Sequence, residues 1–395
     1  MRRRLKSVII GRTGLVGAGL VLLIALLVYK LGNLVGGVSL TELTTATTPV
    51  GWHGIYHHPQ YLPLELFRSA TFFVFSHHGQ ILTRMPNLLF GFMSIISFAC
   101  LISIWHSRRT ALLSTILFAT AAWTLHVSRL ASFDVLYLWA IPTLLLTYNL
   151  LHRYPASKLI WYGSLAAWLL LLYVPGMIWL LLIGTIIEYS VIAKAWRTHQ
   201  LWREVPLSLL LVAVGLPLLV FDLTRPGRLA QWLGAPDHYP SLMTLLRHEA
   251  AVPYHLFVRG PLYPELWLGR APLLDIFTLV LAVIGICFYV LHWQATRTRL
   301  LAALFVISGL LVGLGGQVSF SLLVPLMYVA AATGLAYLIH EWFKTFPRNP
   351  LARGVGLGII GLAVALSCVY NLRAYFVAWP HNATTRSVFR YRLPR

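Results

Sequence analysis

The apolar residues of this chain fall into long runs that are separated by short polar segments. A helix needs about 20 apolar residues to cross the hydrocarbon core of a bilayer. The pattern therefore predicts an all-α integral membrane protein with about 11 transmembrane helices. These helices are expected near residues 8–30, 85–105, 109–127, 133–152, 158–175, 177–194, 205–222, 273–292, 299–314, 318–340 and 354–372.

Basic residues in the short connections predict the orientation of the bundle. Arg and Lys gather in alternate connections, and short basic loops of this kind stay on the cytoplasmic side. They occur at 108–109, 153–158, 194–203, 297–299 and 344–353. The first apolar stretch follows Arg and Lys residues and is longer than the 7–15 residues, roughly, of a signal peptide, so it is expected to be an uncleaved span. The N-terminus is then cytoplasmic and, with an odd number of spans, the C-terminus is extracytoplasmic.

Three longer polar segments are expected outside: the loops 33–84 and 223–272 and the tail 373–395. Trp, Tyr and Pro residues among polar ones indicate that both loops are ordered against the bilayer surface. The segment from Leu62 to Phe75 cannot be a span, because a crossing there would turn every later basic loop outward. It is therefore expected to be an amphipathic helix in the outer interface. Residues 1–372 are expected to form a single bundle.

The composition excludes a soluble protein. Of the 395 residues, 58% are hydrophobic and only 11% are charged, whereas about 25% are charged in soluble domains. The net charge is +20, from 31 basic and 11 acidic residues. In a soluble protein this excess would indicate nucleic acid. Here the basic residues lie between apolar runs, so membrane lipids and phosphates are the expected partners and nucleic acid is not. The expected location is the cell (plasma) membrane.

Two carboxylates at the outer ends of spans are candidates for chemistry, because an acidic residue at mid-membrane costs about 2.5–3.5 kcal/mol. Glu42 follows the first span and could act as a general base, although Ser39 and Glu42 also have the spacing of a capping box. Asp134 begins the fourth span, where the helix dipole alone favours a carboxylate. Its functional role would be to face Glu42 across the mouth of the bundle, with Arg129 close enough to pair with it.

Histidines and cofactor motifs give a weaker signal. His57 and His58 are neighbours in the first outer loop, and adjacent side chains on an extended segment point opposite ways, so contact with a sugar or phosphate is favoured over a zinc site. The three cysteines lie in apolar runs and have no metal-ligand spacing. Walker motifs and dinucleotide fingerprints are absent from the sequence. No certain cofactor or dedicated metal site is therefore expected, and a divalent cation at the outer acidic site stays open.

A set of short motifs in the first half of the chain resembles a known family. Residues 84–91 (RMPNLLFG) precede a span, Arg pairs follow it at 108–109, and residues 119–134 (ATAAWTLHVSRLASFD) lead into the next. In this order and spacing they resemble the GT-C glycosyltransferases, and within these the protein-mannosyltransferase and aminoarabinose-transferase branch. The resemblance covers about residues 30–155, and beyond it only the pattern of spans agrees.

The resemblance implies a membrane glycosyltransferase that takes a sugar from a polyprenyl-phosphate donor and passes it, with inversion, to an extracytoplasmic protein, lipid or glycan. It implies that Glu42 is the second residue of an Asp-Glu pair, with Thr41 in the place of the usual Asp. Asp134 matches the acidic residue at the head of the fourth span, and Arg84 matches the arginine of the second-span motif. The fold would be GT-C-like, with two long extracytoplasmic loops.

The departing phosphate in such a reaction gains negative charge, and preorganised arginines would stabilise it. Arg84, Arg129, Arg259 and Arg270 are the candidates. Two other classes stay open beside the enzyme: a transporter or flippase of lipid-linked intermediates, and a catalytically inactive assembly subunit of the same fold. A transporter would place ionisable residues at mid-membrane, often in an internal repeat. The acids here gather at one face instead, and the departure at Thr41 keeps the inactive subunit open.

Overall fold

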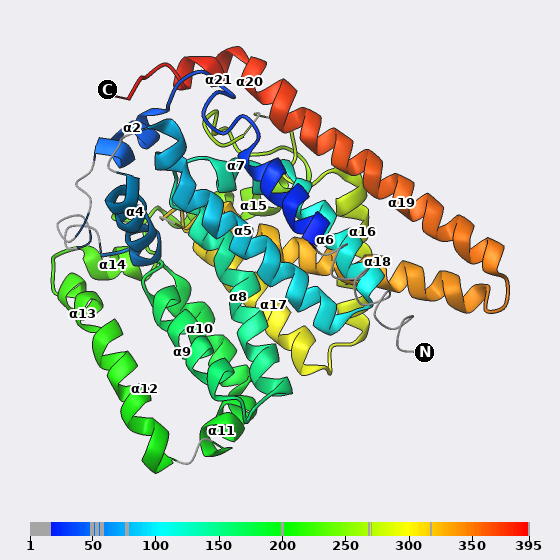
Figure 1. Cartoon of the computed structure of the whole chain (residues 1–395), viewed down its shortest axis with the longest axis horizontal. Coiled ribbons are helices and arrows are strands. Elements are labelled where there is room, and N and C mark those ends of the chain that lie inside the picture. Colours follow the sequence, from blue (N-terminus) through cyan, green and yellow to red (C-terminus); the bar gives the residue numbers. More distant parts are fainter. Residues whose placement is uncertain are drawn as a thin grey trace.

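A computed structural model describes residues 17–393 except 48–50, 52–54, 56–58, 76–78, 199–200, 268, 270 and 317. For residues 201–205, 207 and 214 it describes the backbone alone. The described chain is helical from end to end and holds no strand longer than an isolated bridge (Figure 1). The fold class expected from the sequence is thus confirmed in its coarse form, an all-α chain with apolar helices.

Five helices are long and apolar enough to cross a membrane, or up to seven if each of two bent pairs is one span. The five are α5 (Gln80–Trp105), α8 (Asp134–Arg153), α17 (Thr296–Gly313), α18 (Val324–Thr345, with the preceding turn Phe320–Leu322) and α19 (Pro350–Arg373, continued to His381). The bent pairs are α6 (Arg108–Thr120) with α7 (Ala122–Arg129), at 60°, and α10 (Met177–Ile187) with α11 (Tyr189–Thr198), at 77°.

The other expected spans fall on shorter apolar helices. These are Gly17–Val28, α9 (Lys158–Leu172), α16 (Ile276–Leu291), and α12 (Leu201–Gly215) together with α13 (Pro217–Leu223). Every expected span therefore overlaps helix where the structure describes it, but eleven crossings remain a prediction. The broken pairs explain part of the difference, because a bend shortens each straight segment below the thickness of a bilayer.

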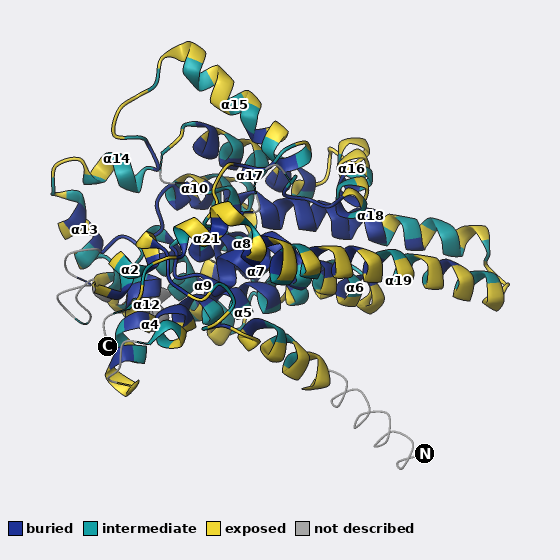
Figure 2. Cartoon of the chain, turned by 90° about the horizontal axis from the view of Figure 1, so that it is seen from above, coloured by how far each residue is buried: buried dark blue, intermediate teal, exposed yellow. Residues whose placement is uncertain are grey.

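The core is formed by α8 and α18, whose side chains are buried on nearly all sides (Figure 2). Helix α18 crosses α16 with almost no gap between the backbones. A Cβ added at Gly285 would lie 1.9 Å from the Ala330 carbonyl oxygen, and one at Gly334 would lie 2.0 Å from that of Leu281. Small residues at a helix crossing allow this approach, which is common in membrane bundles.

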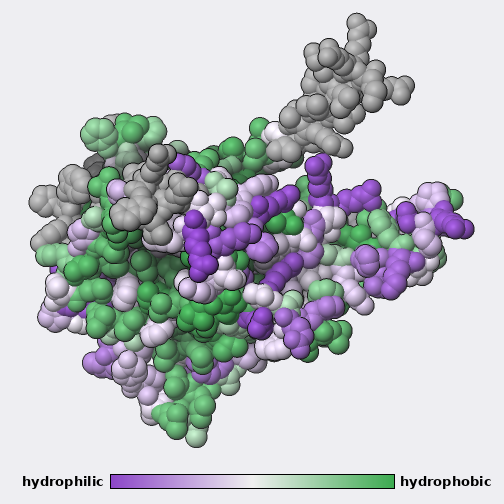
Figure 3. All heavy atoms as spheres, turned by 90° about the horizontal axis from the view of Figure 1, so that it is seen from below, coloured by the Kyte–Doolittle hydropathy of each residue, from purple (hydrophilic) through white to green (hydrophobic). Residues whose placement is uncertain are grey.

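Large apolar side chains cover much of the surface. Phe73, Leu159, Ile276, Leu291 and Leu351 are each at least 80% exposed, and Figure 3 shows a broad hydrophobic area beside gathered hydrophilic side chains. Exposed apolar patches of this size are rare on soluble monomers. The surface is therefore that of a protein whose outer helices face lipid.

The segments expected as outer loops, 33–84 and 223–272, and the tail each hold short helices. The first loop holds α2 (Leu40–Thr47) and α4 (Leu62–Phe75), the latter with the bounds expected for the interface helix. The second holds α14 (Arg228–Trp232) and α15 (Leu242–Phe257). The tail continues α19 through a π-helical turn (Ala374–Ala378) into α20 (Trp379–His381) and α21 (Ala383–Val388).

The tail also closes against the first loop. The Val38 amide donates to the Tyr391 carbonyl at 3.0 Å, and the Tyr391 amide returns a bond to Val38 at 3.2 Å. Trp379, which is fully buried, donates its indole N–H to the carbonyl of Pro264 at 3.2 Å. The tail therefore fixes the positions of both outer loops, rather than extending away from the bundle.

Candidate functional site

Charged side chains converge where α2, the start of α5, the start of α8 and the loop after α15 meet. Helix α2 begins as a capping box: the Ser39 hydroxyl accepts from the Glu42 amide at 3.1 Å, and Glu42 Oε2 accepts from the Ser39 amide at 3.4 Å. The capping spacing seen in the sequence is therefore confirmed. It turns the Glu42 carboxylate inward, where it is 1% exposed.

Glu42 is paired with Arg84 from the first turn of α5. The Arg84 Nε and Nη2 atoms each donate to one carboxylate oxygen at 2.7 Å, which is the planar two-bond arrangement that arginine makes with carboxylates. Arg84 Nη1 donates to the Leu31 carbonyl at 2.6 Å, and the Ala131 amide donates to Glu42 Oε1 at 3.2 Å. Both charges are thus neutralised by each other, and the pair joins α2, α5 and the α7–α8 connection.

A third carboxylate, Glu265, lies next to this pair. The Ser39 hydroxyl donates to one of its oxygens, and the Thr41 hydroxyl donates to the other at 3.1 Å. Burial raises the pKa of Glu265 above its ordinary value, the two hydroxyls oppose the shift, and the negative charges of Glu42 and Asp134 add to it. Glu265 is half-buried and none of the described cations forms an ion pair with it. Glu265, unlike Glu42, therefore has no cation to compensate its charge among the described residues.

Asp134 lies at the other side of the cluster, as the first residue of α8. The Ser132 hydroxyl donates to its Oδ2 at 3.0 Å. The pKa of Tyr61 is raised, chiefly because Tyr61 is buried and secondly because the negative charge of Asp134 lies close to it. Tyr61 stacks on Phe133, the residue before Asp134, with ring centroids 4.1 Å apart. Asp134 thus lies beside Ser132 and Tyr61, on the same side of the bundle as Glu42 and Glu265.

Arg129, at the end of α7, is a buried cation without a carboxylate partner among the described residues. Its Nη2 donates to the Tyr29 carbonyl, but its Nε and Nη1 are buried and donate to no described partner. The rings of Tyr375 and Phe376 lie 5.0 and 4.9 Å from its guanidinium carbon. A buried charge left unpaired is costly. The geometry is that of a guanidinium held by aromatic rings with two donors left over.

His126, one turn before Arg129, lies in a cage of aromatic rings. The rings of Tyr375 and Trp379 lie 4.6 Å from its ring, and that of Trp267 lies at 5.6 Å. Trp267 follows Glu265 by two residues and fixes its loop by donating to the Ala271 carbonyl at 2.7 Å. The cage therefore connects the loop that carries Glu265 to the helix that carries Arg129.

The remaining expected residues do not join the cluster in the described structure. Arg259 is half-buried at the end of α15, where its own carbonyl accepts from the His255 ring. His57, His58 and Arg270 lie outside the described residues. Among the described His, Cys, Asp and Glu residues, no three gather closely enough to hold a metal ion.

Glu265 is the residue that sequence reasoning missed. It belongs to the outer acids, but nothing in its neighbourhood of the sequence singles it out. The signal was indirect: the resemblance to GT-C enzymes implies Asp at the position of Thr41, and the Thr41 hydroxyl donates to Glu265. A carboxylate supplied by the second loop lies where the first loop lacks one.

Comparison with known proteins adds little. No protein-family model matches the chain, and no curated protein matches it. Among solved structures, it is similar to the archaeal oligosaccharyltransferase AglB from Archaeoglobus fulgidus in complex with an inhibitory peptide and a dolichol-phosphate, with a TM-score of 0.49 and 14% identity. The apo form of the Archaeoglobus fulgidus oligosaccharyltransferase gives 0.45 and 14%. The chain is covered to 95% in both but spans only 56% of either structure. Similarity at this level carries no argument about function.

Proposed function

We propose that the chain is a GT-C-type membrane glycosyltransferase that moves a sugar from a polyprenyl-phosphate donor to an extracytoplasmic acceptor, with inversion at the anomeric carbon. One observation carries the proposal: the half-buried carboxylate of Glu265 lies near Glu42 and Asp134, and the buried guanidinium of Arg129 lies near Arg84, at one end of a helical bundle. A base and an anion-stabilising cation are the two groups that such a transfer needs.

The roles follow from how each charge is compensated. Glu42 is occupied on both oxygens by Arg84, so it holds α2 against α5 instead of taking a proton. Glu265 receives only hydroxyl groups, and its raised pKa makes it a stronger base than an ordinary carboxylate. Glu265 is therefore proposed as the general base and Asp134 as a second carboxylate that orients the acceptor. This moves the base from the residue expected in the sequence to its neighbour in space.

The proposed sugar transfer needs neither a redox partner nor a nucleotide. The acceptor hydroxyl or amine gives its proton to Glu265 and forms a bond to the anomeric carbon. The bond from that carbon to the phosphate oxygen breaks, and the electron pair leaves with the polyprenyl phosphate. Attack from the face opposite the departing oxygen inverts the anomeric centre. Arg129, whose Nε and Nη1 have no described partner, would stabilise the phosphate charge in a site of low dielectric.

The test uses the full chain in proteoliposomes loaded with radiolabelled undecaprenyl-phosphate hexose or aminopentose. Transfer of label to water or to added lipid and peptide acceptors supports the enzyme. Label that crosses the bilayer and stays on undecaprenyl phosphate would instead identify a transporter. Binding of the donor with neither transfer nor translocation would identify an inactive assembly subunit. Sugar class is read from which donor is consumed.

A further inference from the structure

The opposite end of α5 carries a second polar region that the transfer reaction does not use. Helix α5 has 26 residues and so is about 39 Å long, and the carboxylate cluster lies at its first turn. At its last turn, a cavity of about 670 Å³ opens between the start of α6, the middle of α18 and α16. The lining residues of this cavity are His106, Ser107, Arg108, Arg109, Thr110, Phe288, Thr333, Ala336, Tyr337, Ile339, His340 and Phe343.

Positive charge is concentrated around this cavity. None of its twelve lining residues is acidic, and two are arginines. Arg297 lies directly behind the wall, where its Nη2 contacts His106 Nε2 at 3.2 Å and Tyr289 Oη at 2.9 Å while its guanidinium stacks 3.6 Å from the Trp105 ring centre. Arginine can only donate, so His106 accepts at Nε2 and carries its proton on Nδ1. Burial and the charge of Arg297 lower the pKa of His106 to about 4, so the ring is neutral at pH 7.

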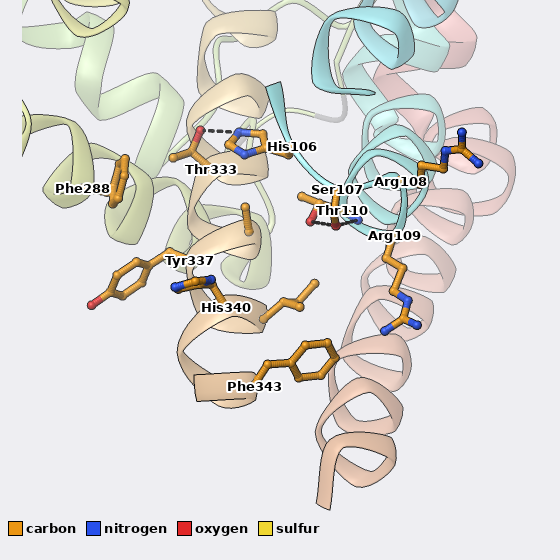
Figure 4. Close-up of a pocket in the computed structure, with 12 residues that line it drawn as sticks. His106, Ser107, Arg108, Arg109, Thr110, Phe288, Thr333, Tyr337, His340 and Phe343 are labelled. Atoms are coloured by element: carbon orange, nitrogen blue, oxygen red, sulfur yellow. Dashed lines mark hydrogen bonds between the residues drawn. The ribbon is translucent and has the colours of Figure 1, made fainter. Parts of the chain in front are cut away.

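Arg109 is the charged side chain that reaches into the region. In Figure 4 it extends down from α6 toward Phe343, whereas Arg108 points away on the far side of the same turn. Its guanidinium carbon lies 5.9 Å from the Phe343 ring centre, and that of Arg353 lies 5.2 Å from the same ring. The nearest acid on α18, Glu341, pairs with Lys344 at 3.8 Å. Two guanidinium groups thus flank one aromatic ring without an acidic partner among the described residues.

The start of α6 adds donors. Ser107 caps the helix by accepting from the Thr110 amide at 3.3 Å, so the amides of Arg108 and Arg109 stay outside the cap. The first turn of a helix carries partial positive charge and unpaired N–H groups, which suits an anion. The opposite wall is apolar, with Phe288, Ile339 and Phe343, and α16 beside it exposes Val290 and Leu291 at 64% and 82%.

We propose that this cavity holds the phosphoryl headgroup of an anionic membrane lipid, with Arg109 and the start of α6 toward the phosphate and an acyl chain along α16. Basic pockets between membrane helices are suited to such headgroups. The apolar wall favours a lipid over a free phosphate, because a free ion gains nothing from it. The site faces the side of the bundle opposite the carboxylates and is independent of the proposed transfer reaction.

Native mass spectrometry of the full chain released from detergent tests this with phosphatidylglycerol and phosphatidylcholine as probes. We expect phosphatidylglycerol to bind in preference to phosphatidylcholine. One surface charge changes binding by roughly fivefold, so R109Q should weaken it about fivefold and R109E by about 20-fold or more. R299Q is the control: Arg299 is an exposed arginine at the start of α17 that does not line the cavity, so its loss should change binding less than twofold.

Three outcomes overturn the proposal. Equal losses in R299Q and R109Q would show a diffuse surface charge instead of a pocket. Retention of phosphatidylglycerol by R109E would place the lipid elsewhere. Displacement of the lipid by millimolar inorganic phosphate, together with thermal stabilisation of the lipid-free chain by phosphate alone, would assign the cavity to a free phosphate. R109Q should unfold within about one degree of the unmodified chain, so that weaker binding cannot be caused by loss of folding.

Discussion

Arg84 and Arg109 lie close to the two ends of one helix, and their surroundings differ in a way that separates two uses of a charge. Arg84, in the first turn of α5, is 3% exposed and gives two 2.7 Å bonds to Glu42. Arg109, four residues beyond the last turn, is exposed and contacts an aromatic ring. The first charge is satisfied within the protein and fixes structure. The second is left for something outside the protein.

The same distinction operates within the carboxylate cluster. Glu42 is compensated, whereas Glu265 and Arg129 are not paired with an opposite charge in the described structure. Substitution of a group that fixes the fold should therefore lower the stability of the protein. Substitution of a group left uncompensated should instead lower its activity or its binding.

Replacing the proposed base should have the largest effect on activity. E265Q keeps the shape of the side chain and one acceptor oxygen for the Ser39 or Thr41 hydroxyl but cannot take a proton, so transfer should fall by about 10²–10⁴. D237N in the same outer loop, where Asp237 is exposed, is the matched control and should keep its rate. Initial rates with labelled undecaprenyl-phosphate sugar give the result. A fully active E265Q would remove Glu265 from the mechanism.

Breaking the Glu42–Arg84 pair should act on stability first. E42A leaves a buried guanidinium without its partner, and this should cost about 3–5 kcal/mol of the free energy of unfolding. At the other end of the bundle, E341A breaks an exposed pair with Lys344 and should change stability by about 0–1 kcal/mol. Denaturant unfolding of both variants in detergent measures the difference. A stable, correctly folded E42A without activity would return the base to Glu42.

Local features of the fold could be predicted from the sequence, whereas contacts between distant segments could not. The helix from Leu62 to Phe75, the start of α8 at Asp134 and the capping box at Ser39 are local patterns, and each was predicted. The contact between Thr41 and Glu265 joins residues 224 positions apart and depends on how two loops fold over the bundle. No periodicity in the sequence encodes such a contact.

The break between α6 and α7 was unpredictable for a related reason. The expected span 109–127 bends by 60° at Ala121, yet Ala is a good helix former. The bend is stabilised from elsewhere: the Ala122 amide donates to Asn371 Oδ1 on α19 at 3.2 Å. Because the partner that satisfies the freed amide comes from another helix, hydropathy gives the apolar length of the segment but not its bend.

Removing the unpaired guanidinium should affect activity without loss of stability. R129M deletes the guanidinium that is proposed to stabilise the departing phosphate, so transfer should fall by about 10²–10³. The variant also removes a buried charge that no described carboxylate balances, so its thermal unfolding should not move downward. R259Q is the comparison, since Arg259 is half-buried and away from the cluster, and its loss should be smaller. Equal losses in both variants would point to a diffuse field in place of a phosphate site.

The smallest effect concerns pH, where the sign can be worked out. Glu265 acts as a base only when ionised, and burial raises its pKa, so transfer should begin to fall at a higher pH than for an ordinary glutamate. A raised carboxylate pKa means that the folded state holds the proton more tightly, so stability from this group declines as pH rises through the raised value. The Thr41 hydroxyl lowers that pKa, so T41V should move the acid limb of kcat/KM further up by less than about one pH unit. T47V, which removes a hydroxyl that donates to the Leu43 carbonyl within α2, controls for loss of a threonine from the same helix. A T41V profile that moves toward lower pH would mean that the group titrating in the rate is not Glu265.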